Sequence, residues 1–498
     1  MSKRSVAFLI FIMAGYSAFC STQKQESTFE RKVFDEFVEE SRKDFDNFRR
    51  RSMSEFTEFL KNPWKEFEKT KPIPEPEQKP VPPVIMDGES PTPIENRPVV
   101  FDEILVPIEY EPQPQPLEPI KEKTLARPEY MEFVFFGTPE KVRLKNSDLP
   151  TLRRCDEASV SAMLDEFASE DYDNTILDCL DIRERRKLSD WAYLQMLDRI
   201  AQNAYPGQKN EAQILLAYLY MQSGYKMRLG SDGSSLYMLF GSRHLIYGKP
   251  SYSVDGENYY GLLELPSRLY ICQARFPGEK SLSLSIDSSQ DFAYNPSDTR
   301  SIVSVGYPEV KFDVAVNKNL LDFYSTYPSS SLEGNVLTRW AMYADTPMEE
   351  PIKATLYPAL REMLKDKSEI EAANILLNTI QTGLQYEYDN EIWGHDRAFF
   401  SEETLFYPYC DCEDRSILLT RLVRDILGLD CLLVYYPEHL ATAIKFSDDG
   451  VKGDYILLDG RRYVIADPTY INAPVGLTMP DMDNSKAKVI VLKSAPRT

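Results

Sequence analysis

Histidine is scarce in this chain, with three residues among 498: His244, His395 and His439. Because imidazole is the usual proton acceptor near neutral pH, general-base chemistry has few candidates here. Positive charge is also limited, since 57 Lys and Arg face 78 Asp and Glu and leave a net charge of −21. Binding to a phosphate backbone needs clustered positive charge, and the globular part of the sequence has no basic run. Nucleic acids are therefore excluded as partners.

Long apolar runs are missing after the first 20 residues, and a membrane-spanning helix needs about 20 such residues. At the start, Lys3 and Arg4 precede the run VAFLIFIMAGYSAF, which is the pattern of an export signal. A buried N-terminal helix is the alternative. Cys20 stands where an acylated cysteine would lie, but Phe19 is bulkier than lipidation signals accept, so lipid anchoring stays open. We predict that residues 1–20 direct export to the periplasm or the cell surface.

Two segments of unusual composition follow. Between Thr28 and Phe67, phenylalanines recur mostly three or four residues apart, which predicts an amphipathic helix within residues 28–70. Such a helix would dock on this protein, on a copy of it, on a partner or on a membrane surface. Residues 71–128 hold 15 of the 34 prolines, and proline fixes the backbone and removes donors. The sequence predicts an extended, largely unpacked linker there.

The globular part begins near Glu129 and mixes helical and strand-like segments, so the predicted fold class is α+β. Helical periodicity comes first and strand-like pieces follow. This order suggests an α+β domain over residues 129–275 and a β-rich segment over residues 276–345. Helices then return and are followed by short strands. We expect a last α+β domain over residues 350–498, in which a helix packs on an antiparallel sheet.

The stretch FYPYCDCEDRSILLTRLVRDILGLDC has two cysteines one residue apart, before a helical pattern. Asp411 is suited to cap that helix together with Asp414, and Gly428 is suited to end it in a left-handed conformation. Cys412 would then lie in the first turn, where unpaired N–H groups and the helix dipole favour a thiolate. The same N–H groups could bind an oxyanion. The sequence therefore predicts Cys412 as a nucleophile with a lowered pKa.

Of the three histidines, His439 is the best partner for that cysteine. It opens a strand 27 residues after Cys412, and Asp467 closes another strand 28 residues later. A carboxylate that accepts a hydrogen bond from the imidazole would fix its tautomer, which completes a Cys–His–Asp set for acyl transfer. His395 is better placed as a loop or cleft-wall residue, and His244 has no cysteine nearby in sequence.

These residues lie in three motifs that resemble the transglutaminase-like superfamily, a branch of the papain-like cysteine hydrolase fold. The motifs are DCEDRSILLTRLVRDILG, EHLATAIKF and YVIADPTY, and the resemblance covers about 120 residues, from Glu371 to Leu492. In that family the cysteine is the nucleophile, the histidine is the base and the aspartate orients the histidine. The resemblance implies these roles for Cys412, His439 and Asp467.

The function implied is an exported, cysteine-dependent acyl-transfer enzyme that hydrolyses amide or peptide bonds in a protein or peptide substrate. We predict no cofactor and no metal for it. The competing function is a non-catalytic binding or scaffold protein of the cell envelope that keeps the fold. In either case, the N-terminal region would supply a tether to the envelope or the membrane surface.

The path of the chain between His439 and Asp467 decides whether the two can meet. If the strands between them formed a simple three-strand meander, Asp467 would end far from His439. We therefore predict that residues 447–453, SDDGVKG, form a bulge or excursion that does not reverse the direction of the chain.

Other roles for the cysteines are open in the sequence. A zinc site is one, although the spacing is not the usual pair of CxxC or HxxxH hooks; its ligands would be Cys410, Cys412, Cys431 and His439. Cys412 could instead be a buried structural residue, with His439 a satisfied core residue. Cys410 could form a disulfide in an oxidising compartment. Spacing does not reveal further pairing among Cys155, Cys179, Cys272 and Cys431.

Residues 210–229 and 413–433 share an order of features: an acidic start, the letters ILL, an amphipathic helix, a glycine and a strand. Ordinary helix-to-strand patterns can produce this order. The alternative is a degenerate second copy of the fold within residues 129–275, without a cysteine at the helix start and without a histidine after the strand.

Overall fold

The computed structural model describes residues 61, 64–77, 79–86, 92–93, 95–105, 112–116, 120–125, 127–145, 147, 149–169, 172–276 and 278–495. Across these residues the fold is mixed α+β, with eleven α-helices and several sheets, which confirms the predicted class. No helix in this part of the chain is long and apolar enough to cross a membrane. The predicted export signal, Cys20 and most of the predicted phenylalanine-rich helix lie outside the described residues.

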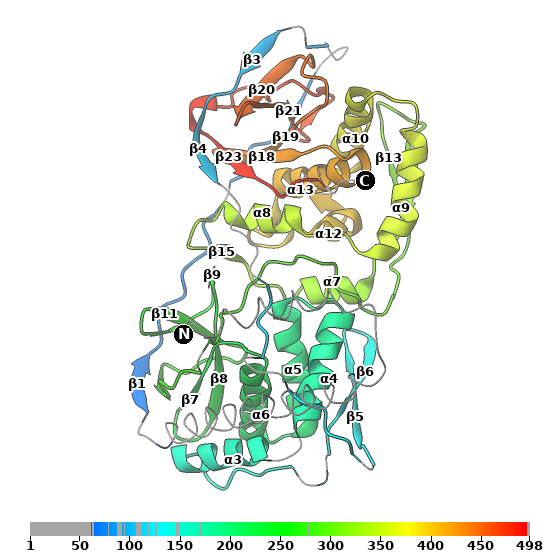
Figure 1. Ribbon diagram of the computed structural model, residues 1–498. Coiled ribbons are helices and arrows are strands. Elements are labelled where there is room, and N and C mark those ends of the chain that lie inside the picture. The colour runs from blue at the N-terminus through cyan, green and yellow to red at the C-terminus, as the bar shows by residue number, and fades with distance from the viewer. Residues whose placement is uncertain are drawn as a thin grey trace, which may run out of the picture. The chain divides into compact units, whose positions relative to one another are not determined.

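Two large sheets dominate the fold (Figure 1). The N-terminal sheet has the strand order β1 (Lys65–Glu68), β12 (Arg268–Ile271), β7 (Met227–Ser231), β8 (Leu236–Gly241), β11 (Glu257–Gly261) and β10 (Tyr252–Val254). The C-terminal sheet has the order β3 (Asn96–Pro98), β20 (Gly453–Leu458), β21 (Arg461–Ala466), β19 (His439–Ile444), β18 (Cys431–Tyr436), β23 (Ala487–Val491) and β4 (Phe101–Leu105).

The two sheets repeat one topology. Strands β12, β7, β8, β11 and β10 correspond in order and direction to β23, β18, β19, β21 and β20, and every pairing among them is antiparallel. The register also agrees. Leu239, the fourth residue of β8, lies opposite the last residue of β11, Gly261. Likewise Thr442, the fourth residue of β19, lies opposite the last residue of β21, Ala466.

A helix precedes each repeated sheet in the chain and packs against the second of its five strands in sequence order. Helix α6 (Lys209–Gln222) packs against β8, and α13 (Cys412–Leu422) packs against β19. The similarity noted between the two helix-to-strand segments therefore extends to five strands, more than a common local pattern explains. Matched position by position, Cys412, His439 and Asp467 correspond to Lys209, Leu236 and Leu262. The N-terminal copy thus lacks all three groups.

Further helices and strands surround the two sheets. Those before and beside the N-terminal sheet are β5 (Tyr130–Phe135), β6 (Thr138–Arg143), α3 (Glu157–Ser169), α4 (Asp173–Arg185), α5 (Asp190–Ala204) and β9 (His244–Ile246). The middle of the chain contains β13 (Arg300–Val303), β14 (Lys311–Val314), α7 (Lys318–Tyr324), β15 (Ser330–Leu332) and α8 (Thr338–Asp345). The segment predicted as β-rich, residues 276–345, therefore carries two helices beside its three short strands.

The remaining elements lead into the C-terminal sheet or follow it. They are α9 (Glu350–Met363), α10 (Glu369–Gly383), β16 (Gln385–Tyr386), α11 (Asp389–Ile392), α12 (Ser401–Phe406), β17 (Tyr409–Cys410), β22 (Tyr470–Ile471) and a short 3₁₀ helix (Asn484–Lys486). In Figure 1, α13 lies against the orange C-terminal sheet, with α8, α10 and α12 around it.

Helix α13 begins and ends where the sequence predicts. The Asp411 side chain accepts hydrogen bonds from the N–H groups of Glu413 and Asp414, and the Asp414 carboxylate accepts one from the Asp411 N–H. Past its regular part, the helix widens into one π-helical turn, Val423–Leu427. Gly428 then ends it with a φ of 68°, a left-handed conformation that favours glycine.

Strand β20 runs in the same direction as β19, because both are antiparallel to β21, which lies between them. The predicted excursion over residues 447–453 is therefore confirmed, since the chain does not reverse there. Arg462 holds this loop by donating to the carbonyls of Asp449 and Val451. As a result, β21 ends opposite the fourth residue of β19, Thr442, and the residue after β21 can reach the start of β19.

The proline-rich segment is extended, but the prediction that it is unpacked is wrong. Within it, β2 (Val84–Ile85) pairs with β22, β3 with β20 and β4 with β23. Just before it, β1 pairs with β12. In Figure 1 the blue strands β1, β3 and β4 lie along the edges of the two sheets. Proline suits sheet edges, where its missing N–H is tolerated. Phe67 lies in β1, so the predicted helix does not reach it. We call residues 64–86 the strap.

Candidate active site

The buried pair of His439 and Asp467 is the centre of the site. His439 is the first residue of β19, and Asp467 directly follows β21. His439 Nε2 and Asp467 Oδ2 are 2.8 Å apart, and both side chains are fully buried. The other carboxylate oxygen, Oδ1, accepts from the Thr469 N–H at 2.9 Å, which fixes the carboxylate. An ionised carboxylate only accepts hydrogen bonds, so this contact assigns the proton to Nε2 and leaves a lone pair on Nδ1.

Nδ1 of His439 is buried and has no hydrogen-bond partner among the described residues. An unsatisfied buried polar atom costs about 1–3 kcal/mol, so such an atom needs an explanation. In a histidine that serves a nucleophile, one ring nitrogen binds the orienting carboxylate and the other takes the proton. The pair is therefore arranged as a base whose proton-accepting atom is unused.

Cys412 is the first residue of α13 and is 2% exposed. The backbone N–H of Leu440, the residue after His439, lies close enough to lower the pKa of its thiol. Ser416 Oγ donates to the Leu440 carbonyl at 2.8 Å, and Thr442 Oγ1 donates to the Ser416 carbonyl at 3.3 Å. These bonds fasten the first turns of α13 to β19. The structure thus brings all three predicted residues to the start of β19.

The thiol of Cys412 and Nδ1 of His439 are not hydrogen-bonded to each other. Catalytic hydrogen bonds in ligand-free enzymes are often long and shorten when substrate binds.

The surroundings of Cys412 raise the pKa of its thiol well above the usual value, so the predicted lowering is wrong. Burial is the largest cause, followed by the negative charges of Asp411 and Glu413, while the Leu440 N–H acts in the opposite direction. Both acidic residues adjoin Cys412 in sequence and are themselves buried. The resting thiol is therefore neutral at pH 7 and needs a base at the moment of attack.

We expect the rate at which iodoacetamide alkylates Cys412 to keep rising above pH 9, the usual thiol pKa. Only the thiolate reacts, and burial with two acidic neighbours disfavours it. The rate is measured at each pH by mass spectrometry of the peptide carrying Cys412, with the urea-unfolded protein as reference. A rate that levels off near about pH 6 would instead show a stable thiolate–imidazolium pair.

Two buried side chains hold the segment that carries Asp467. Gln381 of α10 donates from Nε2, at 2.7–3.1 Å, to the carbonyls of Asp467, Tyr470 and Ala473. Arg415 of α13 is 1% exposed and donates to the Pro468 carbonyl at 3.3 Å. Both act on the catalytic geometry through the backbone. Neither stands out in the sequence, because each occupies an ordinary position within a helical pattern.

A cluster of carboxylates around one arginine adjoins Cys412. Asp389, Asp396 and Glu413 have oxygen atoms within 4.8 Å of one another, and these are the residues that could hold a cation. The Arg339 guanidinium, 1% exposed, donates to Asp396 at 2.8 Å, to Glu413 at 3.3 Å and to Glu75 of the strap. Positive charge is thus already present at the cluster. Burial and then Glu413 raise the pKa of Asp389 to about 8.

The structure separates the ligands of the alternative zinc site. In the β18–β19 ladder, Tyr436 lies opposite His439, whereas Cys431 lies opposite Ile444. Five residues of strand separate the two levels, or ~17 Å at about 3.4 Å per residue, far beyond the reach of one zinc ion. All six cysteines in the described part of the chain are free thiols, so none of them locks Cys412 in a disulfide.

The other two histidines lie elsewhere. His395 is exposed in the loop after α11, where Nδ1 is 3.0 Å from the Trp393 carbonyl. His244 begins β9 beside the N-terminal sheet, and burial lowers its pKa to about 3. His395 thus lies in a loop, as expected, and His244 lies beside the other sheet from Cys412.

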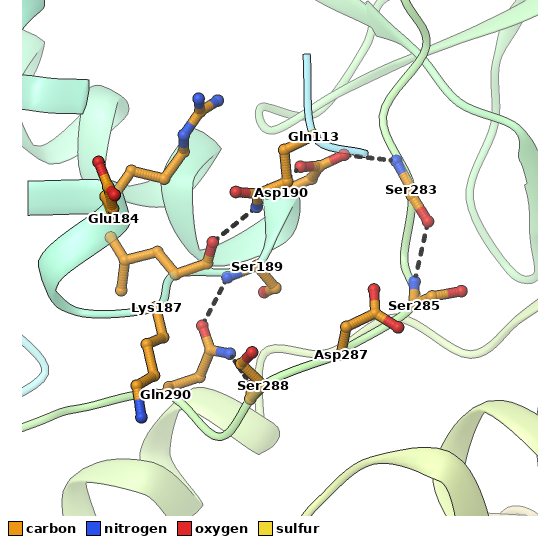
Figure 2. Close-up of a pocket in the computed structure, with 12 residues that line it drawn as sticks. Gln113, Glu184, Lys187, Ser189, Asp190, Ser283, Ser285, Asp287, Ser288 and Gln290 are labelled. Atoms are coloured by element: carbon orange, nitrogen blue, oxygen red, sulfur yellow. Dashed lines mark hydrogen bonds between the residues drawn. The ribbon is translucent and has the colours of Figure 1, made fainter. Parts of the chain in front are cut away.

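A polar cavity of about 220 Å³ lies in the N-terminal half, between the end of α4, the start of α5 and residues 283–290 (Figure 2). Figure 2 shows Asp190 pointing toward Gln113 and Ser283, and its carboxylate accepts from the Gln113 amide at 3.2 Å and the Ser283 N–H at 2.9 Å. Ser189 N–H likewise donates to the Gln290 amide oxygen at 2.7 Å. Because these polar groups satisfy one another, the cavity is held by a structural network.

Comparisons of the chain with protein families, curated proteins and solved structures gave no match. The case for a function therefore rests on the geometry of the site and on the resemblance of its three motifs.

Proposed function

We propose that the chain is a cysteine-dependent acyl-transfer enzyme of the transglutaminase-like type, which hydrolyses amide or peptide bonds. The observation that carries the proposal is the buried contact between His439 and Asp467, with Nδ1 unused, at the strand start where Cys412 also lies. Nucleophilic catalysis by cysteine needs a base beside the sulfur and a group that orients the base. These three residues supply them.

In the proposed reaction, the Cys412 sulfur attacks the carbonyl carbon of the scissile bond while its proton passes to His439 Nδ1. The imidazolium is stabilised because its Nε2–H already points at the Asp467 carboxylate. The amine leaves with the proton from Nδ1, and a thioester remains on the sulfur. His439 then takes a proton from water, whose oxygen attacks the thioester and releases the acid and the thiol.

The developing oxyanion needs hydrogen-bond donors near the sulfur. Glu413 and Asp414 already give their N–H groups to the Asp411 cap. The Cys412 N–H takes no part in that cap and lies at the N-terminal end of the helix, where the dipole favours negative charge. It is the donor that we assign to the oxyanion.

We further propose that the protein acts outside the cytoplasm on a protein or peptide, with the N-terminal region as its tether. Hydrolysis is preferred to cross-linking because an exported enzyme meets abundant water. The second candidate is a non-catalytic binding protein of the cell envelope that keeps the fold. The 2% exposure of Cys412 favours it, because a nucleophile must be reached by its substrate.

Trapping of an acyl-enzyme tests the proposal. Incubation with a p-nitrophenyl ester of a short peptide, followed by acid quench and mass spectrometry, should place one acyl group on Cys412. Cys412→Ala should carry no acyl group, and His439→Ala should be acylated more slowly by a factor of about 10² or more. An added primary amine reports whether water or amine takes the acyl group. Acylation that persists in Cys412→Ala at the wild-type rate would refute the proposal.

A further inference from the structure

The strap crosses the candidate site at Val81. The Val81 N–H donates to the carbonyl of Glu438, the residue before His439, at 3.0 Å. The Val81 carbonyl accepts from the Tyr386 hydroxyl at 3.3 Å. Tyr386 of β16 lies opposite Cys410 of β17, two residues before Cys412. One strap residue therefore bridges the histidine side and the cysteine side of the site.

The next strap residues continue along the aspartate side. Val84 and Ile85 form β2, which pairs in parallel with Tyr470 and Ile471 of β22, three and four residues after Asp467. The Met86 N–H then donates to the Ile471 carbonyl at 3.0 Å. The strap is thus held by its main chain from Glu438 to β22, in the way an added strand is held at a sheet edge.

Open space adjoins the strap at Lys79 and Pro80. A cavity of about 220 Å³ is lined by these two residues together with Tyr388, Asp389 and Asp396. Space for a ligand is therefore present beside the strap.

We infer that residues 79–86 occupy the peptide-binding groove of the proposed enzyme as an internal ligand, so that its substrates are extended, proline-containing peptides and the strap must leave before they reach Cys412. This inference rests on the proposed function. Val81 and Met86 make these contacts with their backbone groups alone, so a peptide of different side chains could make them. Prolines at 80, 82 and 83 favour the extended conformation before binding, which lowers the entropy lost on binding.

The occupied groove also accounts for the burial of Cys412. A segment tethered in cis acts at an effective concentration of about millimolar, so it competes strongly with a free peptide. Glu75 anchors the same segment to the Arg339 cluster. Release of residues 79–86 would expose the site without removing a strand from either large sheet.

The test measures alkylation of Cys412 when the strap is removed and returned. Residues 79–86 are replaced by eight Gly and Ser residues in the full chain, and fragmentation mass spectrometry separates Cys412 from Cys410. We expect alkylation at least about tenfold faster, because each lost hydrogen bond is worth about two- to tenfold. A capped peptide KPVPPVIM should restore protection saturably, and KPPPPVIM, which lacks the Val81 N–H, should do so more weakly.

A point variant tests the same inference if replacement of residues 79–86 disturbs folding. Val81→Pro removes the donor to Glu438 while its neighbours, Pro80 and Pro82, already impose an extended backbone. We expect alkylation about two- to tenfold faster. The matched control is Ile73→Pro, which also lies between two prolines and keeps the carbonyl that accepts from Gly248; its alkylation should equal that of the wild type.

Alkylation at the wild-type rate in both strap variants, or no protection by millimolar KPVPPVIM, would overturn the inference. Alkylation requires no turnover, so the two proposals fail separately. If the strap controls alkylation of Cys412 but esters never acylate the chain, the internal-ligand inference stands and the proposed enzymatic function is refuted. If esters acylate Cys412 but alkylation does not depend on the strap, the enzymatic function stands and the inference is refuted.

Discussion

Cys412→Ala should lower kcat/KM for a peptide ester or amide by about 10⁴-fold or more, because loss of a nucleophile removes the whole covalent route. The thermal midpoint should change little, since the change removes one buried atom. Activity is followed by release of p-nitrophenol and stability by circular dichroism. Both are measured on the full chain.

Cys410 supplies the matched control for this variant. It lies two residues away, is 3% exposed, and its sulfur contacts the Gln385 carbonyl at 3.6 Å. Cys410→Ala should keep wild-type activity, because no step of the proposed reaction uses that thiol. Equal activity of the wild type and Cys412→Ala would favour the non-catalytic binding protein.

Arg339→Met should reduce the free energy of unfolding by about 3–5 kcal/mol, because it leaves buried carboxylates without their counter-charge. Glu413 and Asp396 lie on the cysteine helix and its approach, so activity should fall as well. The change is measured by urea unfolding of the full chain. The control is Arg268→Met, whose side chain is 62% exposed and pairs with Glu68 at 2.9 Å. Surface pairs contribute about 1 kcal/mol or less.

The pH dependence of Arg339→Met distinguishes charge from packing. Burial already raises the folded-state pKa of Glu413 well above its usual value, and the guanidinium of Arg339 opposes this rise, so loss of the guanidinium should raise that pKa further. Raised carboxyl pKa values mean that stability is fully present below the unfolded pKa and is lost as pH rises through the folded one. The deficit relative to wild type should therefore be smaller at low pH than at pH 8. Glu413→Gln, added to Arg339→Met, should recover part of the lost stability at pH 8. A deficit that does not depend on pH would contradict the role of Arg339 as counter-charge.

Local signals in the sequence were sufficient to predict the cysteine helix and the path of the chain to Asp467. Asp411 and Gly428 are strong boundary signals because a side-chain cap and a left-handed residue each act within a few residues. The direction of β20 followed from a geometric requirement, since His439 and Asp467 can meet only if the chain does not reverse after β19. The structure satisfies that requirement.

The path of residues 79–86 could not be predicted, because Val81 and Met86 are held by backbone groups that no side-chain pattern records. Prolines favoured an unpacked linker, yet Val81 and Met86 kept the N–H groups that bind Glu438 and Ile471. Arg339 was missed for a related reason, since it meets Glu413 across 74 residues of sequence.

The sequence contains a signal for the raised pKa of the Cys412 thiol. Asp411 and Glu413 flank the cysteine directly, and like charges oppose formation of a thiolate. The helix dipole alone suggested the opposite direction. Burial then adds to the acidic neighbours, and burial depends on packing that a local pattern does not reveal.

The distance from Cys412 Sγ to His439 Nδ1, in a crystal structure of the strap-exchanged protein bound to a peptide aldehyde, tests the central claim most directly. We expect the aldehyde carbon bonded to Sγ and Nδ1 about 3.5 Å from that sulfur, with Nε2 still on Asp467. A separation beyond about 6 Å, or an aldehyde bound away from Cys412, would show that the three residues do not act together.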